Sequence, residues 1–77
     1  MSEPNISVEL SRAEALVLFE WLSRFNKTSR SDFDDQAEQR VLWDLEAMLE
    51  AILVEPLESR YDDLLAAARA RVRDREE

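Results

Sequence analysis

Carboxylates are the only abundant groups in this chain that could perform acid–base or metal chemistry. The 77 residues include eighteen Asp and Glu but no histidine, cysteine or glycine. Histidine is the usual proton carrier near neutral pH, cysteine provides thiolate nucleophiles and soft metal ligands, and glycine builds phosphate-holding loops. Most recognisable active sites cannot be assembled from what remains. We therefore expect no enzymatic activity, no catalytic residue, no cofactor and no bound metal.

The densest group of carboxylates is Asp32, Asp34 and Asp35. A calcium-binding loop would need a glycine at its sharp turn and a distal bidentate glutamate, and this segment has neither at the required spacing. Acidic residues are favourable at the positive end of a helix dipole. We interpret the group as the start of a helix rather than a metal site.

The charge of the chain is unevenly distributed. The net charge is −8, and residues 32–63 hold eleven acids against only Arg40 and Arg60. Such a block repels nucleic acid and anionic membranes and attracts a basic partner. The alternative is that it only keeps a small protein soluble. No apolar segment is long enough to span a membrane and no cysteine is present to form disulfides, so we expect a cytoplasmic protein without membrane partners.

The periodicity of apolar residues predicts an all-α, three-helix domain over residues 1–77. We expect a helical hairpin from residues 12–25 and 32–54, followed by a C-terminal helix that starts near Pro56 or Ser59. Residues 6–10 alternate between apolar and polar, which favours a short strand as an optional addition. Residues 1–5 and 75–77 are expected to fray.

Local signals mark where the helices begin and end. Ser11 and Glu14 have the spacing of a capping box, in which each side chain bonds to the other's backbone N–H. Asn26 is expected to stop the first helix in a left-handed conformation. Ser31 or Asp32 is expected to cap the second helix. Pro56 should end it, since the residue before a proline avoids the helical region.

The apolar residues exceed what one small core needs. In the first helix they cover an arc of about 200°, so this helix is either central or packed on another molecule. Glu38 of the second helix is expected to pair with Arg24 or Lys27. The predicted core stripe of the third helix includes Leu57 and Tyr61. The predicted core face of the second helix consists of Ala37, Val41, Leu42, Leu45, Met48, Leu49, Ile52 and Leu53.

Trp43 lies opposite that core face, among carboxylates. Three interpretations are open: the third helix or the N-terminal segment covers it, it forms a homodimer contact, or it anchors a protein partner. Buried aromatic anchors dominate the energetics of interfaces. We therefore identify Trp43, Glu46, Glu50 and Trp21 as candidate partner-binding residues, and we expect a homodimer.

The order strand, helix, helix also fits ribbon-helix-helix proteins, which insert a two-stranded ribbon into DNA. In this chain the outward residues of the candidate strand would be Ser7 and Glu9. Neither is basic, so the candidate ribbon would present no cation to phosphates. For this reason a small DNA-associated transcriptional regulator is only the alternative function. We expect that nucleic acid is not a partner.

Three stretches of the sequence together carry a resemblance to known proteins: Val8–Leu16 (VELSRAEAL), Asp35–Leu45 (DQAEQRVLWDL) and Tyr61–Arg69 (YDDLLAAAR). They resemble a family of small uncharacterised bacterial helical proteins with no assigned activity. The resemblance implies a natural bacterial domain and no mechanism. From the residues themselves we expect a non-enzymatic acidic interaction module that binds a basic protein, in the manner of an antitoxin or an immunity protein.

The expected absence of metal and thiol chemistry can be checked directly. Neither a chelator nor a reductant should change the melting temperature, because no ligand cluster or disulfide couples these reagents to folding. Thermal unfolding with and without EDTA, and with and without a reductant, measures this. A clear fall in melting temperature with EDTA would show that carboxylates hold a structural metal.

Overall fold

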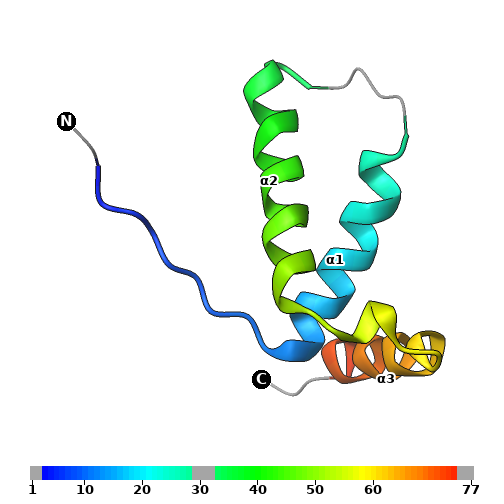
Figure 1. Ribbon diagram of the computed structural model, residues 1–77. Helices are drawn as coiled ribbons and strands as arrows, with labels where there is room; N and C mark the ends of the chain where they lie inside the picture. The colour runs from blue at the N-terminus through cyan, green and yellow to red at the C-terminus, as the bar shows by residue number, and fades with distance from the viewer. Residues whose placement is uncertain (1–2, 29–32, 75–77) are drawn as a thin grey trace.

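The computed structural model describes residues 3–28 and 33–74, and all regular structure within them is helical. The first two helices form an antiparallel hairpin, and the last helix crosses the end of the hairpin where the first one begins (Figure 1). The predicted all-α, three-helix architecture is confirmed. The elements are α1 (Arg12–Asn26), α2 (Gln36–Ile52), the 3-10 helix η1 (Glu55–Leu57) and α3 (Tyr61–Arg73).

The predicted capping box starts α1. The Ser11 hydroxyl accepts the Glu14 N–H at 3.0 Å, and the Glu14 carboxylate accepts the Ser11 N–H at 2.8 Å. The expected left-handed stop at Asn26 is wrong, because no residue in the described part of the chain has a positive φ. Asn26 stays helical, and Lys27 ends α1 in a right-handed conformation (φ −82°, ψ −13°). The Asn26 side chain instead donates hydrogen bonds to Leu42 and Glu46 of α2.

The N-terminus of α2 is capped by Asp35, whose carboxylate accepts the Ala37 N–H at 2.8 Å. The two predicted caps, Ser31 and Asp32, lie outside the described residues. An aspartate at this position satisfies one of the free N–H groups of the first turn. The interpretation of the acidic cluster as a helix start is consistent with this cap.

Glu38 belongs to the same N-terminal arrangement. Its carboxylate accepts the Asp34 N–H at 3.0 Å, and its side chain is exposed. The expected ion pair with Arg24 or Lys27 is therefore wrong. A glutamate in the first turn reaches back more readily to a nearby free N–H than across to a neighbouring helix.

The chain turns between α2 and α3 earlier than the sequence predicted. Leu53 leaves the helix in an extended conformation (φ −83°, ψ 133°), and its side chain is buried. The predicted end of the second helix near Val54 is thus late by two residues. Pro56 lies in η1 rather than in α3, and α3 begins only at Tyr61.

The core lies between α1 and each of the other two helices. The main packing pairs are α1 with α3 and α1 with α2. Leu22 of α1 is completely buried. Of the two alternatives that the width of the apolar arc left open, a central position or packing on another molecule, the structure shows the central position for the first helix. The buried residues are Ala15, Leu16, Phe19 and Leu22 of α1, Leu49 and Leu53 from the end of α2, and Leu65 and Ala68 of α3.

The buried face of α2 is narrower than predicted. Only Leu49 and Leu53 of the predicted core face are buried, and Leu42 and Leu45 are partly buried. The reason is that α2 packs mainly on α1, and α3 covers α1 much more than α2. One helix covers only a stripe of its neighbour. The predicted core residues that are exposed instead are Ala37, Val41, Met48 and Ile52.

The inner side of α3 agrees with the prediction except at its start. Leu65 and Ala68 are buried, and Tyr61 and Leu64 are partly buried against the core. Leu57 is 89% exposed, so its assignment to the core stripe is wrong. It lies in η1, where the helical period of α3 does not apply.

Residues 3–10 form no element and run away from the helices as an extended segment (Figure 1). No strand is present in the described parts of the chain, so residues 6–10 have no partner strand here. Every side chain from Glu3 to Leu10 is exposed. Of the ends that were expected to fray, residues 1–2 and 75–77 lie outside the described residues.

The revised face of α2 gives a stability prediction. Leu49→Ala should lower the free energy of unfolding by about 2–5 kcal/mol, because it leaves a cavity against α1. The neighbouring Met48→Ala should change the unfolding free energy of the monomeric chain by about 0.5 kcal/mol or less, as exposed positions do. Urea unfolding followed by circular dichroism measures both. Similar losses at the two positions would contradict the narrow face.

Candidate functional site

Three of the four predicted partner-binding residues share one side of α2. Trp43, Glu46 and Glu50 follow one another at spacings of three and four residues, which places them on one helix face. We call these three residues the acidic face. Trp21 lies on α1. The structure therefore brings three of the candidates together and places the fourth on another helix.

The acidic face combines an aromatic ring with carboxylates of different exposure. Trp43 is 46% exposed, and Glu50 is exposed. Glu46 is partly buried and accepts a hydrogen bond of 2.7 Å from the side-chain amide of Asn26. The same amide donates to the Leu42 carbonyl at 3.4 Å. Glu46 thus ties α2 to α1, which leaves Trp43 and Glu50 as the outward pair.

Trp21 belongs to a separate aromatic cluster. Its ring stacks on Phe25, with centroids 4.8 Å apart and an interplanar angle of 17°. Phe25 in turn meets the edge of Phe33, with centroids 5.9 Å apart. These rings lie where α1 ends and the chain leads into α2. Trp21 is 44% exposed, so it presents a second aromatic surface.

Within residues 3–28 and 33–74, the carboxylates of α2 form no ion pair. The ion pairs among residues 3–28 and 33–74 are Arg12–Glu55, Arg24–Glu20 and Arg73–Asp74, and none includes a side chain of α2. Arg40 is the single cation in this helix. Asp44 and Glu50 are exposed. The negative potential of α2 is consequently not neutralised by neighbouring helices in the described structure.

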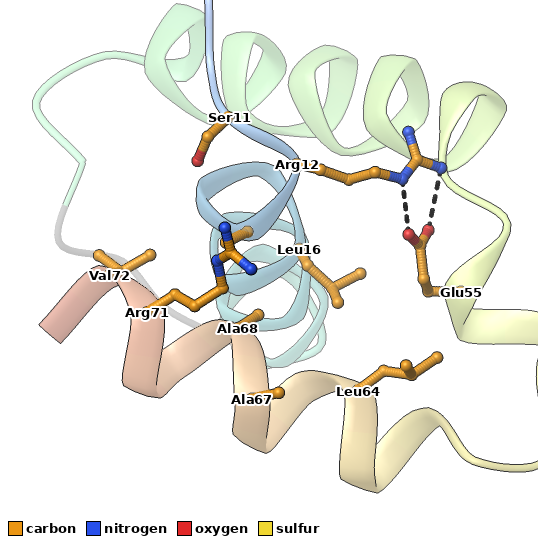
Figure 2. Close-up of a pocket in the computed structure, with 10 residues that line it drawn as sticks. Ser11, Arg12, Leu16, Glu55, Leu64, Ala67, Ala68, Arg71 and Val72 are labelled. Atoms are coloured by element: carbon orange, nitrogen blue, oxygen red, sulfur yellow. Dashed lines mark hydrogen bonds and ion pairs between the residues drawn. The ribbon is translucent and has the colours of Figure 1, made fainter. Parts of the chain in front are cut away.

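A cleft of about 540 Å³ lies between the start of α1 and α3, with Leu16, Ala68 and Arg71 among its lining residues (Figure 2). Across its rim the Arg12 guanidinium binds the Glu55 carboxylate in two contacts, Nε–Oε2 at 2.6 Å and Nη2–Oε1 at 3.1 Å. The hydrogen bond from Arg12 lowers the pKa of Glu55.

Three polar residues at this cleft, Ser11, Arg12 and Glu55, make structural contacts. The hydroxyl of Ser11 caps α1, and no basic group activates it there. Arg12 and Glu55 satisfy each other. A nucleophile next to a base, or two carboxylates with separated pKa values, would be needed for hydrolytic chemistry. The described residues at this cleft provide a bidentate ion pair and an apolar floor.

A second polar contact connects α3 with α1. The Tyr61 hydroxyl donates to the Glu20 carboxylate at 2.8 Å. Burial raises the pKa of Tyr61, and the hydrogen bond to Glu20 raises it further. Arg24 lies one turn further along α1, 3.7 Å from the same carboxyl group. Tyr61 therefore orients the start of α3, although its sequence neighbourhood suggested only a core position.

The sequence interpretation missed all three polar contacts between elements. Arg12–Glu55, Asn26–Glu46 and Tyr61–Glu20 join residues 43, 20 and 41 positions apart. Helical periodicity reports which side of a helix is apolar, but not which residue of another helix lies opposite. One sequence feature could have indicated the Asn26–Glu46 contact: each of these residues lies at the edge of the apolar face of its helix.

No protein-family profile, curated protein or solved structure matches this chain. The resemblance to small bacterial helical proteins therefore stays a prediction. In residues 3–28 and 33–74 no group of three or more metal-ligating side chains is assembled. None of the helices formed by those residues has the length and apolar character needed to cross a bilayer.

The Arg12–Glu55 contact predicts a specific response to acid. Because the pKa of Glu55 is lower in the folded state, its contribution to stability is present above the unfolded value of about 4.3 and is lost as the pH falls through the folded value. Glu55→Gln should therefore lose less stability than the wild type on acidification below about pH 4.3.

Urea unfolding at a series of pH values measures this difference. Glu58→Gln is the matched control, because Glu58 is exposed and its carboxylate makes no ion pair in the described structure. Its acid profile should follow that of the wild type. Parallel profiles for wild type and Glu55→Gln would show that the ion pair does not contribute in solution.

Proposed function

We propose that this protein is a non-enzymatic interaction module of the bacterial cytoplasm that binds a basic protein through the acidic face. Its action would be antitoxin-like or immunity-like: an acidic domain occupies and holds a basic surface of its partner. We further propose that it acts as a homodimer. The absence of histidine and cysteine from the chain supports a role in binding rather than in catalysis.

One observation carries the proposal: a half-exposed tryptophan lies beside carboxylates that form no ion pair with the described residues. Trp43 is 46% exposed, and Glu50 on the same face is exposed. An aromatic side chain that becomes buried at the centre of an interface contributes much of the binding energy. The surrounding negative charge accelerates encounter with a positive surface. Anchor and charge together fit a basic partner with an apolar pocket.

The homodimer is supported by the amount of surface that the chain leaves uncovered. The accessible surface is 6560 Å², whereas a compact monomer of 9.0 kDa exposes about 4900 Å². The excess of about 1700 Å² exceeds the share of about 800 Å² that each partner buries in a standard interface. Exposed large apolar side chains include Ile6, Val8, Val41, Met48 and Ile52.

The alternative, a DNA-associated regulator of ribbon-helix-helix-like architecture, has less support. Binding to DNA is driven by neutralising phosphates with Lys and Arg. The extended segment 3–10 contains Glu3 and Glu9 and no basic residue. The net charge of −8 opposes approach to a polyanion. A basic protein is the partner that this charge favours.

The test is the affinity for a basic protein captured from an extract of the source organism and then purified. Trp43→Ala should weaken that complex by about 2 kcal/mol or more, roughly 30-fold in Kd. Glu50→Lys should weaken it as well, and more strongly at low salt, where screening is least. Isothermal titration at two salt concentrations measures both effects.

Glu58→Lys is the matched control, because it makes the same charge change at an exposed position outside the acidic face. It should weaken binding less than Glu50→Lys. Circular dichroism establishes that each variant keeps its helices. A complex that tolerates both Trp43→Ala and Glu50→Lys would place the binding surface elsewhere and would contradict the proposal.

A further inference from the structure

The extended segment before α1 has the pattern of a strand but no partner in its own chain. Ile6, Val8 and Leu10 alternate with Ser7 and Glu9, and they are 90%, 77% and 43% exposed. No backbone hydrogen bond joins residues 3–10 to the remainder of the described chain. Unpaired strand groups are a template for pairing with another chain.

An apolar gap lies between this segment and α2. It has a volume of about 430 Å³ and lies between Val8 and Leu10 on one side and Leu49, Ile52 and Leu53 on the other, with Glu9 and Arg12 also among its lining residues. Ile52 is 64% exposed, and Met48, one helical turn earlier, is 56% exposed. Apolar residues thus face the gap from both sides, and no described part of the chain fills it.

We propose that residues 6–10 pair with the same residues of a second copy of this chain, as an antiparallel two-stranded ribbon centred on Val8. The apolar side of the ribbon then closes against the exposed edge of α2 in both copies. This inference rests on the proposed homodimer and identifies its interface. Trp43, on another face of α2, remains available for the basic partner.

The sequence of the segment selects this register. With Val8 opposite its own counterpart, Ile6 lies opposite Leu10 of the second copy, so all three cross-strand pairs on one face are apolar. Glu9 then lies opposite Ser7. A shift that centres the ribbon on Glu9 would place two like charges opposite each other, which is unfavourable. A shift that centres the ribbon on Ser7 would place Leu10 opposite Pro4. Proline has no backbone N–H and cannot donate a hydrogen bond to the neighbouring strand.

The area agrees with a dimer of this kind. The chain exposes about 1700 Å² more than a compact monomer of its mass, and exposed apolar side chains of the segment before α1 and of α2 contribute to that surface. The Cα radius of gyration is 14.4 Å, against about 11.5 Å for a compact chain of this length. A two-fold interface uses the same surface on both partners, as a self-complementary ribbon does.

Single cysteines test the register, because the chain has none of its own. In an antiparallel ribbon, opposite Cα atoms are about 4.5–5.5 Å apart, within the range a disulfide allows. Val8→Cys should therefore form a disulfide-linked dimer under mild oxidation. Ile6→Cys alone should not, since its two copies lie about 14 Å apart along the ribbon.

A mixture of Ile6→Cys and Leu10→Cys should cross-link with each other in preference to themselves. Ile6→Cys is also the control for random collision, because Ile6 is more exposed than Val8. Gel electrophoresis without reductant measures the products, and chains of different tag length identify the mixed dimer. Cross-linking of Ile6→Cys as efficient as that of Val8→Cys would overturn the register.

Sedimentation of charge variants tests whether the ribbon holds the dimer. Val8→Asp should weaken the dimer by at least about tenfold, because it places two charges opposite each other on an apolar face. Asn5→Asp adds the same charge on the polar side and should leave dimerisation close to that of the wild type. Both positions are exposed, so helicity should be unchanged in each variant.

The outcomes separate this inference from the proposal on which it rests. A wild-type chain that stays monomeric at all concentrations would overturn both the homodimer and the ribbon. A dimer that withstands Val8→Asp would overturn the ribbon alone and leave the homodimer standing. Loss of the basic partner in Trp43→Ala, with the dimer intact, would support two separate surfaces.

Discussion

Packing against α1 is the interaction on which the structure depends. Half of the buried core residues lie on this helix, and its Leu22 is the most deeply enclosed side chain. Both α2 and α3 pack mainly on α1. The second and third helices are therefore held together mainly through α1. A substitution in the buried face of α1 affects its packing with both of them.

Three polar contacts then set the orientation of each element around α1. Arg12 binds Glu55 at the start of the helix, Glu20 accepts from Tyr61 in its middle, and Asn26 donates to Glu46 at its end. Apolar packing alone leaves sliding and rotation weakly determined, because the hydrophobic effect is not directional. An exposed ion pair such as Arg12–Glu55 contributes little net stability, so its value lies mainly in its geometry.

The sequence was sufficient for features that depend on neighbours along the chain. The capping box at Ser11 and Glu14 and the three helices were predicted, since each follows from local spacing, and a central position was one of two alternatives for α1. The buried width of α2 was not, because it depends on where α3 packs. Met48 and Ile52 fit the apolar pattern and are nevertheless exposed. At the candidate site, helical spacing placed Trp43 with Glu50, but the use of Glu46 to hold Asn26 required three-dimensional information.

The position of α1 in the chain also has a consequence for synthesis. The helix that supports the core is made before both of its partners, and Leu65 and Ala68 are added only after more than forty further residues. At translation rates of about 5–20 residues per second, several seconds pass between the two events. Until α3 is made, the face of α1 that α3 covers has no partner within the chain. That face is therefore the last part of the core to be buried.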